Sequence, residues 1–182
     1  SGKNFRDIIV KGVSVDSRTL KKGNLFISIK GENIDGHRFI SQALRKGAVS
    51  VIVSDKKYIK NINKPTLLVK DTIKTLGDIA LNYRKKFSLE TIGVTGSNGK
   101  TTTKDLISHI LSSKFNVVKS IRSYNNFIGV PLTLFEVGKN TQKIIIEMET
   151  NIIGGIKRLC EIAHPSIGII TNIGNTHLET LN

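Results

Sequence analysis

The first 86 residues alternate between short apolar runs and stretches in which apolar positions recur with helical spacing. Strands are predicted at 13–15, 24–29, 50–54 and 66–69. A helix is predicted around 39–44, with Gly47 as its stop, and Asp71 can cap a second helix. The apolar face of that second helix comprises Ile73, Leu76, Ala80 and Tyr83. The pattern predicts a small α/β domain over residues 1–86.

A polar stretch at 84–86 separates this part from a second run of elements. Strands are predicted at 91–94, 116–119, 143–147 and 166–171, and helices at about 100–113 and 153–163. The predicted apolar faces are Leu106, Ile107, Ile110 and Leu111 in the first helix, and Ile156, Leu159, Cys160 and Ala163 in the second. Strands that alternate with helices predict a parallel sheet with right-handed crossovers, so residues 87–182 form a second α/β unit.

The sharpest local feature is the stretch GVTGSNGKTTT from Gly93 to Thr103, between a predicted strand and a predicted helix. Glycines let the backbone wrap around phosphate oxygens, and the N–H groups at a helix start attract the anion. Lys100 is expected to reach the β and γ phosphates of a nucleoside triphosphate, and Thr101 to place its hydroxyl on Mg²⁺. The predicted phosphate contacts are Gly96, Ser97, Asn98, Gly99, Lys100, Thr101 and Thr102.

The same loop departs from the general phosphate-loop pattern, because Val94 stands where the first glycine is usual. The alternative interpretation is a tight strand-to-helix turn with an incidental lysine. We favour phosphate binding because the strand, the glycines, the Lys-Thr pair and the helix coincide. The loop alone leaves the reaction open.

Composition narrows the class of protein. Lysine and arginine outnumber aspartate and glutamate by 28 to 14, and the net charge of +14 could suit a nucleic-acid-binding module. The lysines are spread along the chain and aromatic residues make up only 5%, so no base-stacking surface is indicated. The single cysteine, Cys160, excludes an internal disulfide. Because we find no secretory signal and no apolar run near the roughly 20 residues of a membrane span, we expect a cytoplasmic protein.

Four further stretches occur in order around the loop. They are Asp16 to Ile40 (DSR, GNLFI, a glycine and DGHRFI), Tyr124 to Leu134 (YNNFIGVPLTL), Ile144 to Glu149 (IIIEME) and Thr171 to Glu179 (TNIGNTHLE). Together with the loop they resemble the Mur ligase superfamily, which includes the peptidoglycan precursor ligases and folylpolyglutamate synthetase. The resemblance covers the chain from about Val13 to Glu179. Its asparagine stretch is typical of the members that add D-alanyl-D-alanine.

The resemblance implies roles for individual residues. The implied contacts to the UDP part of a precursor are Ser17, Arg18, Gly31, Asp35 and His37. Asn125 and Asn126 are implied to line the path between the precursor and the γ-phosphate, and Asn172 is implied to lie near the reacting groups as a substrate contact. The implied catalytic residues are Lys100, Asn126 and His177, and the implied Mg²⁺ ligands are Thr101, Glu147 and His177. For residues 16–18 the alternative is a turn in which Asp16 and Arg18 form a surface ion pair.

Two positions depart from the family pattern. Glu149 stands where a glycine is usual, and Thr176 stands where an alanine is common. Glu147 ends an apolar strand, where ligands of open α/β sheets gather, so a second carboxylate nearby could strengthen or disturb metal binding. We interpret Glu149 as a solvated loop charge.

The resemblance implies an ATP-dependent amide ligase of peptidoglycan precursor synthesis that uses ATP and Mg²⁺. The terminal carboxylate of UDP-N-acetylmuramoyl-tripeptide would form an acyl phosphate, and the amine of D-alanyl-D-alanine would then displace phosphate. In this interpretation residues 1–86 bind the UDP precursor and residues 87–182 form part of a central ATP-binding domain. Because family members are longer, we expect a fragment that is inactive alone and that could self-associate through an exposed sheet edge.

Four alternatives stay open at the level of the sequence. Another Mur-type amino-acid ligase would use a different amine or acceptor. A different P-loop ATPase or kinase would bind ATP without a UDP-sugar. A nucleic-acid-binding module would show affinity that falls steeply with salt. A non-catalytic nucleotide-binding remnant would retain only the pocket of the N-terminal domain.

Overall fold

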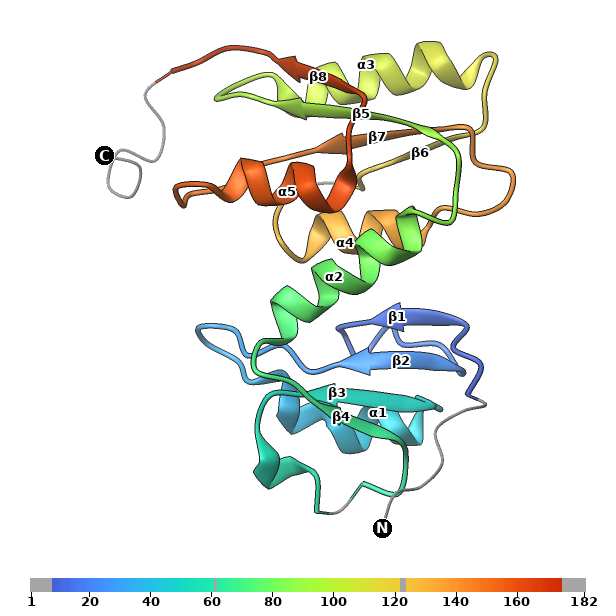
Figure 1. Cartoon of the computed structure of the whole chain (residues 1–182), viewed down its shortest axis with the longest axis vertical. Helices are drawn as coiled ribbons and strands as arrows, with labels where there is room; N and C mark the ends of the chain where they lie inside the picture. Colours follow the sequence, from blue (N-terminus) through green and yellow to red (C-terminus); the bar gives the residue numbers. More distant parts are fainter. Residues whose placement is uncertain (1–7, 61, 122–123, 175–182) are drawn as a thin grey trace. The chain divides into compact units, whose positions relative to one another are not determined.

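A computed structural model describes residues 8–60, 62–121 and 124–174 (Figure 1). The chain forms two compact units, Ser1–Leu76 and Gly77–Asn182. Their division falls within helix α2 (Thr72–Arg84), before the boundary expected at 86/87, which stays a prediction. No helix in the described ranges is both long and apolar enough to cross a membrane.

The first unit is built on a parallel sheet. Its strands, in spatial order, are β1 (Gly12–Ser14), β2 (Asn24–Ile27), β3 (Ser50–Val53) and β4 (Thr66–Leu68). Its helices are η1 (Gly36–Phe39), α1 (Ile40–Arg45) and η2 (Lys56–Tyr58). The core on the α1 side comprises Leu20, Phe26, Ile40, Ala43, Ala48, Val51 and Val53. The four predicted strands and the predicted helix are therefore present.

The second unit is a separate parallel sheet with the strand order β6-β7-β5-β8. The strands are β5 (Glu90–Thr95), β6 (Val117–Lys119), β7 (Lys143–Glu147) and β8 (Ile167–Ile170). The helices that follow them are α3 (Lys100–Ser112), α4 (Gly129–Phe135) and α5 (Gly155–Ala163). Helix α3 packs on one face of the sheet, whereas α4 and α5 pack on the other (Figure 1). The predicted parallel α/β fold is confirmed.

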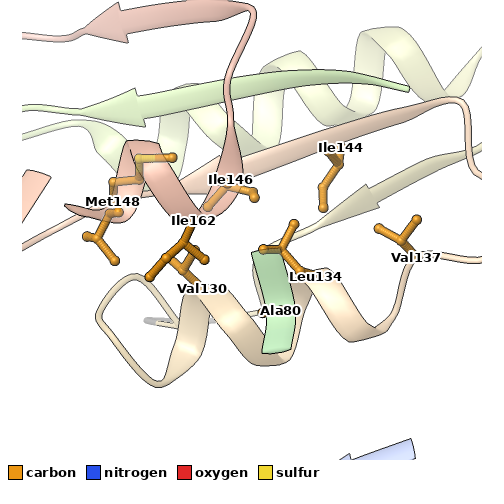
Figure 2. Packing of buried hydrophobic residues seen from close by; sticks show 10 residues of the cluster. Ala80, Val130, Leu134, Val137, Ile144, Ile146, Met148 and Ile162 are labelled. Atoms are coloured by element: carbon orange, nitrogen blue, oxygen red, sulfur yellow. The ribbon is translucent and has the colours of Figure 1, made fainter. Parts of the chain in front are cut away.

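Strand β7 shows why this sheet is apolar on both faces. Ile144 and Ile146 point into the cluster formed with α4 and α5, as Figure 2 shows, whereas Ile145 packs with Ile92 and Val94 on the α3 side. All three isoleucines are fully buried. A continuous apolar run is the pattern of a strand that helices cover on both sides. The polar residues that follow these strands therefore lie at one edge of a well-packed sheet.

Helix α4 is absent from the helices predicted from the sequence, in which residues 124–134 were noted only for their resemblance to a family motif. The helix begins at Gly129, and Pro131 lies in its first turn, where a missing N–H costs no helical hydrogen bond. The side-chain oxygen of Asn126 accepts from the amides of Ile128 and Gly129 and so caps this helix start. The turn-forming residues are therefore the first turn of the helix itself.

The predicted apolar face of α3 was half wrong. Leu106 and Ile110 are 59% and 67% exposed, whereas Ile107 and Leu111 pack toward the sheet. The buried residues of this helix are instead polar: Lys100, Lys104 and Ser108. Because these three positions are four residues apart, they form one stripe that faces the sheet. Lys104 and Ser108 therefore lie on the same side of the helix as Lys100.

Candidate functional site

The glycine-rich loop joins β5 to α3 in a conformation that requires glycine at two places. Gly96 has a φ of +133° and Gly99 a φ of +78°, in the region that side-chain-bearing residues rarely adopt. A Cβ on Gly96 would lie 2.2 Å from the hydroxyl oxygen of Thr171. The backbone therefore passes directly against the segment that follows β8. The loop leads into the N-terminus of a 13-residue helix, whose first N–H groups have no partner within the helix.

Lys100 reaches back over this loop. Its ammonium donates to the carbonyl oxygens of Gly96, at 2.7 Å, and Ser97, at 3.2 Å. It also lies 3.4 Å from a carboxylate oxygen of Glu149, and its side chain is only 9% exposed. The cation is thus held at the mouth of the loop, where a phosphate group would meet both it and the start of α3.

Glu147 ends β7 and is 2% exposed. One of its carboxylate oxygens accepts from the Thr101 hydroxyl at 2.8 Å, and the other accepts from the Asn125 amide at 3.0 Å. The ammonium of Lys104 lies 3.8 Å away and is itself buried, donating to the carbonyl oxygen of Ser120. A buried carboxylate needs such partners, because its transfer out of water without a compensating hydrogen bond or ion pair costs free energy. The cluster therefore stabilises a negative charge beside the loop.

The side chains of Thr101 and Glu147 offer oxygen atoms, the type of ligand that a hard divalent cation prefers. Mg²⁺ takes oxygen ligands and usually keeps several waters, with one or two carboxylates and substrate phosphates. Within the described part of the chain no three His, Cys, Asp or Glu side chains gather into a metal cluster. A cation here would therefore depend on phosphate and water oxygens besides these two side chains. His177, the third predicted ligand, lies outside the described residues.

The segment after β8 braces the loop. The side-chain oxygen of Asn172 accepts from the amide of Asn98 at 2.8 Å, and its backbone oxygen accepts from the amide of Ser97 at 3.2 Å. Thr171 donates from its hydroxyl to the carbonyl of Asn98 at 2.5 Å. Asn172 thus lies at the predicted site, but in contact with the loop backbone. Thr102 is exposed in the first turn of α3.

A cavity of about 530 Å³ opens beside the loop. Its lining comes from the ends of β5 and β8 and from the start of α5, and includes Thr95, Gly96, Ser97, Glu149, Ile153 and Asn172. Besides the polar atoms of the loop, five isoleucines contribute to the lining: Ile152, Ile153, Ile156, Ile170 and Ile173. Ligands of open α/β sheets bind at this edge, outside the carboxyl ends of the strands.

The two adjacent asparagines separate. Asn125 is buried and donates to Glu147 at 3.0 Å and to Glu149 at 2.7 Å. Asn126 is exposed and caps α4. The structure therefore brings Lys100, Thr101, Asn125 and Glu147 together, whereas the side-chain oxygen of Asn126 is engaged elsewhere. Lys104 and Ser120 also belong to this cluster and were missed, although Lys104 lies one helical turn after Lys100 and so shares its face.

In the first unit, the predicted residues near the start of the chain make local contacts. Ser17 is buried and donates to the side-chain oxygen of Gln42 at 2.7 Å. Arg18 forms a two-pronged ion pair with Asp16, and its side chain is 83% exposed. The Arg18 hydrogen bond lowers the pKa of Asp16, and the same pair raises the pKa of Arg18. The surface ion pair that was the alternative interpretation is present. A guanidinium this exposed remains accessible to an anion.

Asp35 and His37 form a closed arrangement in the same unit. The His37 ring is buried, stacks on Tyr58 at a centroid distance of 4.9 Å, and accepts at Nε2 from the amide of Ser54. Because Nε2 accepts, Nδ1 carries the proton and donates to Asp35 at 2.6 Å. Burial works to raise the pKa of Asp35, but hydrogen bonds from the side chain and backbone of His37 outweigh it and hold that pKa below its usual value. Gly31 lies in a turn, where its amide donates to the carbonyl of Ile34.

Comparisons with known proteins agree with this geometry. The family model described as Mur ligase middle domain matches residues 94–182, and that described as Mur ligase family, catalytic domain matches residues 9–84. A relative from Synechocystis sp. named UDP-N-acetylmuramoyl-tripeptide–D-alanyl-D-alanine ligase is 43% identical over 96% of this chain and 38% of its own length.

Solved structures give the same result. MurF from Acinetobacter baumannii is 34% identical, with a TM-score of 0.86 over 93% of this chain and 37% of its own. MurF ligase from Thermotoga maritima in complex with ADP is also 34% identical, with a TM-score of 0.84 over 96% of this chain and 40% of its own. The chain thus spans about two-fifths of the length of the proteins it matches. On both the sequence and the structural comparisons, this chain belongs to the Mur ligase family.

Proposed function

We propose that this chain provides the ATP-phosphate site and the UDP-precursor site of a ligase that joins D-alanyl-D-alanine to UDP-N-acetylmuramoyl-tripeptide in the cytoplasm. The observation that carries the proposal is the strand–loop–helix of β5 and α3, which holds Lys100 and Thr101 beside the buried Glu147. The printed names of the relatives support the choice of substrates, and the ADP complex of the Thermotoga maritima protein supports the nucleotide.

In this proposal the loop binds the terminal phosphates of ATP. The first N–H groups of α3 point at the anion, and Lys100 exchanges its loop carbonyls for phosphate oxygens. Thr101 and Glu147 would hold Mg²⁺, which when bound screens the negative charge of the phosphates. The ammonium of Lys104 lies 3.8 Å from Glu147 and helps to fix its carboxylate in place. His177 is proposed as a further ligand on the resemblance alone.

The chemistry follows from the charges that must be stabilised. The terminal carboxylate of the tripeptide attacks the γ-phosphorus, the bond to ADP breaks, and an acyl phosphate forms. The amine of D-alanyl-D-alanine then attacks the acyl carbon, inorganic phosphate leaves, and the amine proton passes to solvent. Lys100 stabilises the charge on the transferred phosphoryl group. Asn125 and Asn172, which lie beside the loop, are proposed to position the reacting carboxylate.

The first unit is proposed to hold the UDP part of the precursor. Arg18 is the best contact, because its exposed guanidinium can exchange the Asp16 carboxylate for a diphosphate. Ser17 and Gly31 lie in the same unit and are proposed as weaker contacts. Asp35 and His37 are hydrogen-bonded to each other, so we propose that they stabilise the fold of this region and do not contact the precursor directly.

Titration calorimetry of this 182-residue chain with MgADP and with UDP-N-acetylmuramoyl-tripeptide tests both sites. Lys100→Ala is expected to weaken MgADP binding by about 10- to 100-fold, because hydrogen bonds to charged groups contribute about 1.5–3 kcal/mol. Arg18→Ala is expected to weaken binding of the precursor and to leave the affinity for MgADP unchanged. Lys114→Ala, two residues beyond the C-terminal end of α3, is the matched control for loss of a positive charge.

The outcomes separate the alternatives. MgADP binding without precursor binding would remove the proposed precursor site and leave the nucleotide site. UDP alone is the control ligand, and equal affinity for UDP and for the complete precursor would show that this chain contacts only the UDP part. If a folded chain bound neither ligand, both proposed sites would be wrong.

A further inference from the structure

Glu149 lies two residues beyond the end of β7, at the rim of the phosphate loop. We propose that the carboxylate of Glu149 forms an ion pair with the Lys100 ammonium in the nucleotide-free protein. It then competes with the nucleotide phosphates for that cation. Glu149 would then be a positioning residue that sets nucleotide affinity. This inference rests on the proposed binding of nucleotide phosphates at the loop.

The carboxylate is held in place from two directions. One oxygen lies 3.4 Å from the ammonium of Lys100, and the other accepts from the side-chain amide of Asn125 at 2.7 Å. The backbone amide of Glu149 also donates to the backbone oxygen of Asn125 at 2.8 Å. The same asparagine therefore fixes both the backbone and the carboxylate of Glu149. The contact with Lys100 is a directed one, in contrast to the solvated charge that was expected from the sequence.

The neighbouring carboxylate shows the difference. Glu147 is buried and lies beside the hydroxyl of Thr101 and the ammonium of Lys104, so its charge is compensated within the packed unit. The side chain of Glu149 is 39% exposed and pairs with the ammonium of Lys100, the group proposed to bind the nucleotide phosphates. An ion pair with one exposed partner is weak enough to exchange. Phosphate groups can displace Glu149 from Lys100, and the displaced charge then repels them.

The competition predicts that removal of the Glu149 charge strengthens binding. Glu149→Gln keeps the size of the side chain and an oxygen that can accept from Asn125. Titration of the 182-residue chain with ADP in EDTA should show binding about two- to fivefold tighter than for the unsubstituted chain, the range expected for a weak ion pair that no longer competes. Structural damage would weaken binding, so a gain distinguishes competition from a purely structural role.

Glu136→Gln is the matched control. Glu136 is exposed and precedes β7, whereas Glu149 follows it, so the two charges lie toward opposite ends of this strand. Both substitutions remove one negative charge from the same unit. Affinity for ADP in EDTA should be unchanged by Glu136→Gln. An equal gain in both variants would show that net charge, and not the contact with Lys100, sets the affinity, and would overturn the inference.

A second variant and a second condition complete the test. Glu149→Gly removes the side chain and should also tighten ADP binding in EDTA. Unchanged or weaker binding in both variants would overturn the inference. Weaker binding confined to MgADP would indicate that Glu149 serves as a cation ligand instead. If the unsubstituted chain binds ADP and Lys100→Ala does not, the proposed function stands whatever Glu149 does. Failure of the unsubstituted chain to bind ADP would overturn both.

Discussion

Two polar clusters of this chain both consist of side chains that are hydrogen-bonded or ion-paired to one another, but only one of them lies at the rim of a cavity. In the first unit, Asp35, His37 and Ser54 satisfy one another, and the ring of Tyr58 stacks on the histidine. At the phosphate loop, Lys100 and Glu149 also satisfy each other, but at a rim that opens on a cavity. Burial of partnered polar groups therefore identifies a site only where the partners can be exchanged for a ligand. The first cluster supports the fold, and the second has the geometry of a binding site.

The largest effect is expected where the phosphate cluster is itself structural. Glu147→Ala removes one of the two carboxylates beside the buried ammonium of Lys104 and leaves the Thr101 hydroxyl and the Asn125 amide without this acceptor, so it should lower the free energy of unfolding by about 3–5 kcal/mol. Glu149→Ala, on the exposed rim, should lower it by less than about 1 kcal/mol. Urea denaturation of both variants measures the difference. Equal losses would mean that the two carboxylates do not differ as the structure indicates.

The closed cluster should matter for stability alone. His37→Ala leaves the amide of Ser54 without its acceptor and removes the stacked ring, so the free energy of unfolding should fall by about 2–3 kcal/mol. Affinity for MgADP should be unchanged under conditions in which the variant is folded. His109→Ala, at an exposed position of α3, is the control and should change neither quantity. Loss of MgADP affinity with His37→Ala would contradict the separation of the two clusters.

The smallest expected effect is a pH dependence. The pKa of Asp35 is lower in the folded protein than its usual value of 3.8, so the carboxylate contributes stability above that pH. This contribution is lost as pH falls through the lowered folded-state pKa. In thermal unfolding below about pH 4, the gap in melting temperature between the unsubstituted chain and Asp35→Asn should therefore shrink as pH falls. A gap that widened toward acid would reverse the sign and refute the role of the His37 hydrogen bonds.

The sequence predicted those features that depend on regular spacing. Strand β7 was recognised because three successive isoleucines precede a carboxylate, and the phosphate loop because glycines, lysine and threonine lie between a strand and a helix. Helix α4 was missed because seven residues that begin with Gly and contain Pro give no clear helical period. The contact between Glu149 and Lys100 could not be read from the sequence, because it depends on how two separate strand ends meet in space.

Helix α3 has a consequence for the tolerance of the chain to substitution. Its sheet-facing stripe contains Lys100, Lys104 and Ser108, whereas Leu106 and Ile110 are exposed. A mutational scan of this helix should therefore show an inverted profile. Polar replacements should be accepted at the two apolar positions, and even apolar replacements should be rejected at Lys104. Hydropathy alone would predict the reverse map.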